Sequence, residues 1–185
     1  MKYFLAVAAI FIAPSALGAE QGTSARLAEQ RQAMTLLNWM DGEWRGDAAI
    51  VTPAGKHLVT QTERVGSMLD GTVKVIEGLG LGEDGRPEFN ALAIISYDPD
   101  SKSYAFRSYA QGHSGTFPVV ATVGEYIWEV PAGPQAIVRY RARQESGKWV
   151  ETGDFLREGQ PPRRVFEMAL RRTGDTEWPA GRDVP

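Results

Sequence analysis

Short runs of alternating apolar and polar residues, separated by turn residues, make up most of the chain. They begin at residue 43, recur at spacings of about 8–12 residues and end at residue 172. In order, the runs are Glu43–Thr52, His57–Val65, Thr72–Leu79, Glu88–Tyr97, Ser103–Gln111, Thr116–Val123, Glu125–Val130, Gln135–Gln144, Lys148–Arg157 and Arg164–Arg172. No crossover helix separates them, so we predict an all-β fold, an antiparallel up-and-down β-barrel of about 8–10 strands.

One helix is expected ahead of these strands, over Thr23–Met40. Leu27, Met34 and Leu37 recur there at helical spacing among charged residues, and the segment contains neither glycine nor proline. Gly42 follows directly and can adopt the left-handed backbone that ends a helix.

Residues 1–19 have the pattern of a secretory signal peptide. Lys2 gives a positive start, and an unbroken apolar run from Tyr3 to Ala13 follows it. That run is shorter than the roughly 20 apolar residues that cross a bilayer. Cleavage is expected after Gly18 or Ala19, which would leave no stable membrane anchor. We predict a periplasmic or secreted protein, and without any cysteine it carries neither a lipid anchor nor a disulfide.

Length and composition fit one globular domain. The 185 residues are 43% hydrophobic and 23% charged, and the net charge of −3 comes with no dense basic run, so we expect no nucleic-acid partner. The expected division is a signal peptide over 1–19, an N-terminal helix and lead-in over 20–42, a β-barrel over 43–172 and a flexible tail over 173–185.

The run Gln135–Gln144 argues against a barrel embedded in a membrane. Its apolar residues alternate with Arg139, Arg141 and Arg143, which would therefore share the outer face. In lipid each arginine would cost roughly 2–4 kcal/mol near the bilayer midplane. Water is the better solvent for that face.

A Gly-x-Trp motif, Gly42-Glu43-Trp44, lies between the expected helix and the first strand, and Arg172 ends the last strand on its apolar face. This arrangement resembles the lipocalin-like barrels, or calycins. The resemblance implies that Gly42, Trp44 and Arg172 are structural and close the barrel. The guanidinium of Arg172 would cover the Trp44 indole, a contact that contributes about 0.5–2 kcal/mol.

Within that superfamily the chain is similar to a family of small secreted bacterial proteins that have a lipocalin-like domain and no assigned function. The resembling segments are Gly42-Glu43-Trp44-Arg45-Gly46, Thr62-Glu63-Arg64-Val65, Leu69-Asp70-Gly71, Ile95-Ser96-Tyr97-Asp98, Tyr104, Ser108-Tyr109, Gly112, Trp149, Glu151 and Phe166-Glu167-Met168. The chain differs from the haem-binding, nitrobindin-like relatives, because no strand position matches their haem-ligating histidine. The resemblance implies a fold and adds no catalytic residue.

Two histidines and no cysteine are too few for a structural zinc site, which needs about four ligands. We expect no metal and no cofactor. His57 begins a strand after a turn, whereas His113 lies between two strands and therefore at a rim of the barrel, where ligands contact barrels. No nucleophile elbow surrounds the neighbouring Ser114.

Ser146-Gly147 has the composition of a two-residue hairpin turn. The resulting register pairs Glu145 with Lys148, Gln144 with Trp149, Ala142 with Glu151, Tyr140 with Gly153 and Arg139 with Asp154. If Tyr140 points inward, Trp149 and Glu151 do too, and Arg139 and Asp154 form an outward ion pair. A slip of one residue would instead turn Glu151 to solvent.

A carboxylate inside a barrel requires a partner, such as Arg107, Tyr140 or a ligand group. Gly153 and Ala142 beside Glu151, and Ala91 and Ala93 on another strand, would leave space for a ligand. The expected ligand-binding residues are Tyr109, His113, Tyr140, Trp149 and Glu151. Glu63, Glu77 and Arg107 are weaker candidates, because their strands do not alternate cleanly.

These features favour an exported barrel that binds a small, mainly apolar or amphipathic molecule. One alternative is an enzyme on the same barrel, a cyclase, isomerase or hydrolase with Glu151 or His113 as general base. Another alternative is an interaction module of the cell envelope whose barrel is filled by side chains.

Overall fold

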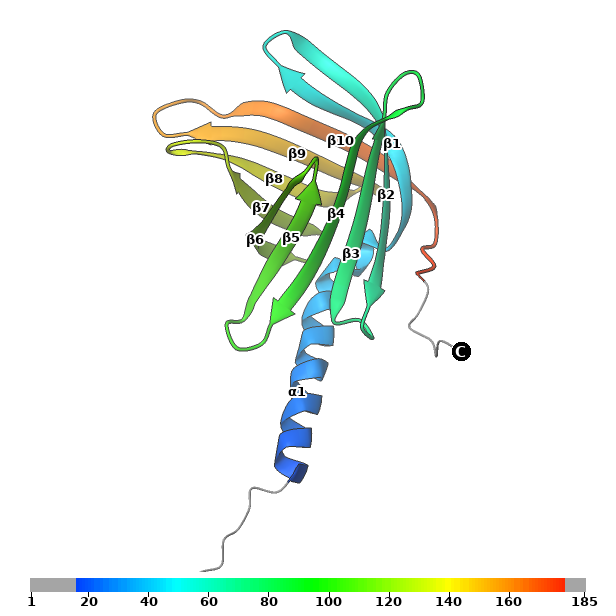
Figure 1. The fold of residues 1–185 in the computed structure, drawn as a ribbon, viewed down its shortest axis with the longest axis vertical. Helices are drawn as coiled ribbons and strands as arrows, with labels where there is room; N and C mark the ends of the chain where they lie inside the picture. Colours follow the sequence, from blue (N-terminus) through cyan, green and yellow to red (C-terminus); the bar gives the residue numbers. More distant parts are fainter. Residues whose placement is uncertain (1–15, 179–185) are drawn as a thin grey trace, which may run out of the picture.

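Ten antiparallel strands close into one barrel in the computed structural model, which describes residues 16–178, with side chains from residue 21 onward (Figure 1). The strands are β1 Gly42–Thr52, β2 Gly55–Met68, β3 Val73–Leu81, β4 Pro87–Asp98, β5 Ser103–Ala110, β6 His113–Thr122, β7 Glu125–Pro131, β8 Ala136–Glu145, β9 Lys148–Arg157 and β10 Arg163–Gly174. Each strand pairs with the next in sequence, and β10 returns to pair with β1. The predicted all-β, up-and-down barrel with one N-terminal helix is confirmed.

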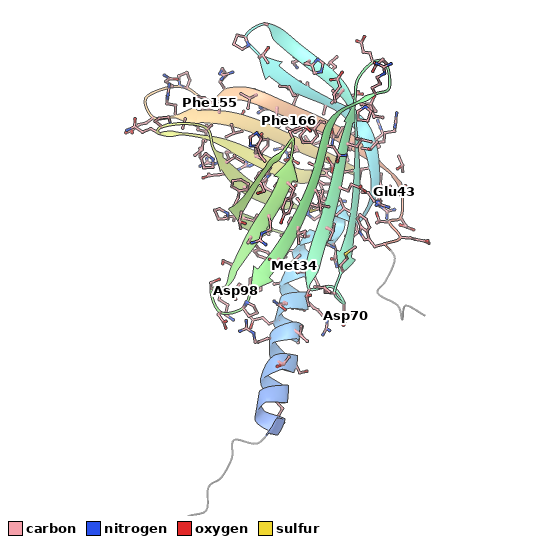
Figure 2. The ribbon with its side chains drawn as sticks, in the orientation of Figure 1. Met34, Glu43, Asp70, Asp98, Phe155 and Phe166 are labelled. Atoms are coloured by element: carbon pink, nitrogen blue, oxygen red, sulfur yellow. The ribbon has the colours of Figure 1, made fainter. Side chains whose placement is uncertain are left out.

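A helix precedes the strands, as the sequence predicts, although it begins earlier, and it lies at one end of the barrel. α1 spans Ala16–Met34 and continues as a 3₁₀ turn, η1, over Thr35–Met40. The first part of α1 extends away from the strands, and its end meets the barrel at Met34 (Figures 1 and 2). Among the described residues no helix is long and apolar enough to cross a membrane. Residues 1–15, most of the predicted signal peptide, lie outside the described part of the chain.

The turns at this end of the barrel hold the helix in place. Arg31 donates from Nε to the Asp70 carbonyl oxygen at 2.8 Å and also forms an ion pair with the Asp70 carboxylate. Tyr104 Oη donates to the Ala33 carbonyl oxygen at 2.7 Å. Arg26 forms ion pairs with Asp98, the last residue of β4, and with Asp100 in the turn after it.

The 3₁₀ turn closes this end of the barrel with apolar side chains. Leu37 and Met40 are fully buried and pack with Trp44 and Trp149. The Trp44 indole N–H donates to the Met40 carbonyl oxygen at 2.7 Å, and its ring meets Trp149 edge-on with centroids 5.9 Å apart. We call this cluster of Leu37, Met40, Trp44 and Trp149 the floor.

Trp44 and Arg172 are direct neighbours across β1 and β10, as expected for residues that close the barrel. The expected cation–π contact between them is not formed, however. Arg172 donates from Nε to the Asp41 carbonyl oxygen at 3.1 Å and pairs with the exposed Asp175 carboxylate. Because the Trp44 ring already packs against Trp149, the half-exposed guanidinium binds polar groups at the edge instead. A side chain at Gly42 would collide with it, since a Cβ there would lie 2.6 Å from Arg172 Nε.

The chain remains in contact with the barrel beyond Arg172, where the sequence predicts a flexible tail. β10 continues to Gly174, and the Trp178 ring lies against β2. The Arg64 guanidinium carbon is 4.0 Å from the centroid of that ring. Residues 179–185 lie outside the described part of the chain.

Candidate functional site

The β8–β9 hairpin has the predicted register throughout. Ala142 pairs with Glu151 and Tyr140 with Gly153 across the Ser146-Gly147 turn. Glu151 therefore faces the interior, and only 7% of its surface is exposed.

The outward face of the same hairpin differs from the prediction in one contact. Arg139 and Asp154 are register partners but form no ion pair with each other. Arg139 Nε instead lies 2.7 Å from Glu129 on β7, and Arg164 on β10 binds Asp154 at 2.6 Å. Arg139 therefore reaches from β8 to β7, and Arg164 reaches from β10 to β9, so both charges of the predicted pair still have partners on the outer surface.

Glu151 is surrounded by aromatic donors. Tyr126 Oη and Trp128 Nε1 each lie 3.5 Å from one of its carboxylate oxygens. Burial raises the pKa of Glu151 to about 7, against the opposing effect of the Trp128, Trp149 and Tyr126 donors. The Trp149 indole N–H faces this carboxylate, yet it is buried and has no hydrogen-bond partner. At neutral pH Glu151 therefore holds its proton for part of the time.

Glu63 on β2 is a second interior carboxyl group. Gln61 Nε2 donates to Glu63 Oε1 at 2.7 Å. Burial is the largest cause that raises the pKa of Glu63 to about 8; the Gln61 hydrogen bond opposes this rise, and the charge of Glu151 adds to it. The carboxyl group lies over Gly78 on β3, where a Cβ would be 2.9 Å from both oxygens. The sequence identified Glu63 as a weaker candidate, and the structure places it inside.

An aromatic stack lies beside the two carboxyl groups. The Trp128 ring is parallel to Phe106 on one side and to Tyr140 on the other, with centroids 4.4 and 4.5 Å apart and interplanar angles of 16°. Phe166 on β10 meets the Tyr140 ring edge-on at 5.9 Å. The stack spans β5, β7 and β8, and its rings cover both faces of Trp128.

The interior is open to solvent above the floor. The floor residues Leu37 and Met40 are fully buried, whereas the inward-facing Glu63, Trp128 and Tyr140 remain partly exposed. These three side chains point inward and are still partly exposed, unlike the floor beneath them. Phe155 and Phe166 lie toward this open end, opposite to Met34 (Figure 2).

The wall is also interrupted between β6 and β7. Their pairing covers only Val119–Thr122 with Glu125–Trp128, so the first half of β6 and the last residues of β7 are not paired with each other. Pro118, which has no N–H to donate, lies where the pairing ends. The interruption begins beside Trp128.

Two of the predicted ligand-binding residues do not line the interior. Tyr109 pairs with Leu92 and Ser114 and is 44% exposed, so it faces outward, opposite in direction to the buried Phe106 on the same strand. His113 is exposed at the open rim, where it begins β6 after a two-residue turn at Gln111 and Gly112. Tyr109 and His113 line a shallow depression on the outside of this hairpin.

The remaining candidates also lie away from the interior. Arg107 is exposed and donates to Thr116, so it is not the partner of Glu151. Glu77 is exposed and pairs with Arg64. His57 binds Glu88 at 2.5 Å at the open rim.

Gly153 does not leave open space beside Glu151, as the sequence suggested. A Cβ at this position would lie 2.8 Å from Tyr140 Cε1 and 3.0 Å from Phe166 Cβ. The missing side chain makes room for the Tyr140 ring, so Gly153 supports the aromatic stack. Between residues 16 and 178, no group of three or more His, Cys, Asp or Glu side chains could hold a metal ion.

These features define a class of protein: a closed, ten-stranded antiparallel barrel with a plugged floor and a partly open interior that holds two carboxyl groups and an aromatic stack. Among solved structures, the chain is similar to the crystal structure of Rv2717c from M. tuberculosis, with a TM-score of 0.57 and 13% sequence identity, over 80% of this chain and 99% of that one. At this identity the likeness shows the fold alone. No protein-family model and no curated protein matches the chain.

Proposed function

We propose that this chain is an exported, lipocalin-like barrel that binds a small, mainly apolar ligand in its interior. The observation that carries the proposal is the partly exposed, inward-facing surface of Trp128, Tyr140 and Glu63 above a sealed floor. Apolar sites with a few polar groups are typical of small-molecule binding. Tyr140, Trp149 and Glu151 remain in the proposed site, joined by Glu63, Trp128 and Phe106.

The calycin resemblance and the export both belong to this proposal. The floor supports the calycin assignment, because Trp44 on the first strand packs against η1. The apolar run in residues 3–13 supports export. Expression of the full chain in a bacterium, with fractionation and mass measurement of the product, should give a periplasmic or secreted protein that lacks residues 1–18 or 1–19. A cytoplasmic product of full mass would contradict export.

Binding can be tested with N-phenyl-1-naphthylamine, a neutral apolar dye that fluoresces in dry sites. We expect saturable binding of one dye per chain, weakened at least about fivefold by Tyr140→Leu because the stack loses a ring. Tyr109→Leu is the matched control, since it removes the same ring from the outer face and should leave binding unchanged. Absence of saturable binding, or equal losses in both variants, would contradict an interior site.

A second candidate, an enzyme that transfers protons on the same barrel, is favoured by the two carboxyl groups, Glu63 and Glu151, that face the interior. The Glu151 pKa of about 7 suits a general base, and the still more basic Glu63 could hold the proton to be returned. Native mass spectrometry of protein from its own cells would separate the two functions. A carrier retains one small molecule, whereas an enzyme retains a substrate and product, which chromatography of the extracted ligand separates even when their masses are equal, and whose ratio changes in Glu151→Gln. If no small molecule binds, the third alternative, an interaction module, is favoured.

A further inference from the structure

We infer that the ligand is an amphipathic amine whose ammonium group binds at Glu63 and Glu151 and whose apolar body lies on the Phe106–Trp128–Tyr140 stack. The inference rests on the proposed function and adds the chemical class of the ligand.

The first argument is that neither interior carboxyl group has a cationic partner. Within residues 21–178, no Lys, Arg or His forms an ion pair with Glu63 or Glu151. Lys74, the fully buried lysine, is bound to Asp41 in the turn below the floor. A buried carboxylate without a counter-charge is costly, and an ammonium ion from outside the chain would offset that cost.

The second argument is that the two carboxyl groups act on one shared region. Glu151 and Glu63 lie on strands separated in the barrel only by β10 and β1. The charge of each raises the pKa of Tyr126, whose hydroxyl is 3.5 Å from Glu151. One bound cation could therefore interact favourably with both groups.

The third argument is that the donors already present do not satisfy the acceptors. An ionised carboxylate has about four acceptor positions. Glu63 receives one short hydrogen bond from Gln61, and Glu151 has two 3.5 Å contacts, from Tyr126 and Trp128, and the approach of the Trp149 N–H, none of them a close hydrogen bond. Acceptor positions on the oxygens of both carboxyl groups therefore remain without a close donor on the surface that faces the interior.

The chemistry of the site selects an amine over other amphiphiles. When they are ionised, the two carboxylates repel an anion, and a neutral hydroxyl can offset no charge. An ammonium group supplies up to three donors and is attracted to the faces of aromatic rings by about 0.5–2 kcal/mol. Trp128 and Tyr140 stack on each other, so this attraction is limited to the ring faces that the stack leaves uncovered.

Isothermal titration calorimetry at pH 7.5 tests the inference with 2-phenylethylamine and n-octylamine as probes. The neutral 2-phenylethanol and the anionic phenylacetate are the matched competitors. We expect at least one amine to bind about tenfold or more tighter than the alcohol, and phenylacetate not to bind. Binding should release protons, seen as a heat that changes with buffer ionisation enthalpy, because a cation lowers the pKa of both carboxyl groups.

Glu63→Gln and Glu151→Gln should each remove most of the preference for the amine. Glu77→Gln, an exposed outward residue on β3, is the control and should retain it. Circular dichroism would verify that each variant is folded. If N-phenyl-1-naphthylamine binds but neither amine displaces it, or if the alcohol binds as tightly as the amine, the inference is overturned and the proposed function stands. If no dye and no probe binds, the proposed function itself fails.

Discussion

Glu63 on β2 and Glu151 on β9 face the same barrel interior, and the negative charge of Glu151 helps to raise the pKa of Glu63 to about 8. The outer faces of the same two strands form ion pairs, such as Arg64 with Glu77 and Asp154 with Arg164. The protein thus pairs its charges on the outside and leaves two acids without counter-charges inside. That contrast has consequences for stability as well as for binding.

Glu63→Gln should stabilise the ligand-free protein at alkaline pH. The pKa of Glu63 rises from 4.5 to about 8 on folding. Between pH 4.5 and pH 8, Glu63 is therefore protonated in the folded chain but ionised in the unfolded chain. The free energy of unfolding therefore falls as the pH rises from 4.5 to 8 and then levels off. Glutamine stays neutral, so the variant should gain about 2 kcal/mol at pH 9, less than full burial would give because the side chain is partly exposed.

Urea unfolding at pH 4.5 and pH 9 measures this difference. The two proteins should have closely similar unfolding free energies at the lower pH, where Glu63 is neutral in the folded state. Glu77→Gln should show no gain at pH 9, because Glu77 is exposed and paired with Arg64. A Glu63→Gln variant that is less stable than wild type at pH 9 would show that the carboxylate is stabilised there by a partner.

Gly153→Ala should destabilise the barrel by about 1–3 kcal/mol, the usual range for overpacking. The new methyl group would lie 2.8 Å from the Tyr140 ring, which cannot move freely because it is stacked on Trp128. Thermal unfolding measures the loss, and Tyr140→Leu in the same chain should recover part of it. Gly22→Ala on α1 is the control, since nothing lies within 4 Å of its Cβ. A Gly153→Ala variant as stable as wild type would mean that the stack is loose.

The sequence predicted the barrel well because its turns are locally encoded. Ser146 and Gly147 both adopt positive φ, and this two-residue turn alone determines the register that places Glu151 inside. The same alternation of apolar and polar residues gave all ten strands within a few residues of their ends. Local chemistry was sufficient for these features.

The sequence could not place residues on strands that carry aromatic side chains on both faces. On β5, Tyr104 and Phe106 point inward but Tyr109 points outward, and only pairing with β4 and β6 decides between them. Glu63 has the same difficulty, because polar residues precede and follow it on β2. Tyr126 and Trp128 alternate within Glu125–Pro131 and could have been recognised as an inward aromatic face. Their contact with Glu151 depends on packing between strands distant in sequence.

Trp178→Ala should destabilise the protein by about 1 kcal/mol, since Arg64 loses a cation–π contact and Gly66 loses the ring that covers it. Gly66→Ala should have a similar effect, because a methyl group there would overlap the Trp178 ring. In the double variant the second change should add little, which a double-mutant cycle from urea unfolding would measure. Fully additive losses would show that the ring does not lie on Gly66 in solution.

Asp41→Ala should be more damaging than Lys74→Met, although the two side chains form one ion pair. Lys74 is fully buried, and its ammonium binds Asp41 at 2.5 Å, Ser67 at 2.8 Å and Asn38 at 3.2 Å, whereas Asp41 is 37% exposed. Removal of Asp41 leaves the buried Lys74 ammonium with neutral partners only. The free energy of unfolding should therefore fall by about 3 kcal/mol. Removal of Lys74 leaves a carboxylate that water can reach, and methionine fills much of the space, so the loss should be under about 1.5 kcal/mol.

The pH dependence of Asp41→Ala provides an independent measurement of the same effect. Burial lowers the pKa of Lys74, and Asp41 opposes that change. Without Asp41, the pKa of Lys74 in the folded state should fall further. The folded chain then binds fewer protons than the unfolded chain over a wider pH range below 10.5. The free energy of unfolding should then rise with pH more steeply than in wild type. Urea titrations from pH 7 to pH 10 would show this slope. Equal slopes, or a greater loss in Lys74→Met, would mean that the ammonium is solvated and that the buried ion pair does not hold η1 against the barrel.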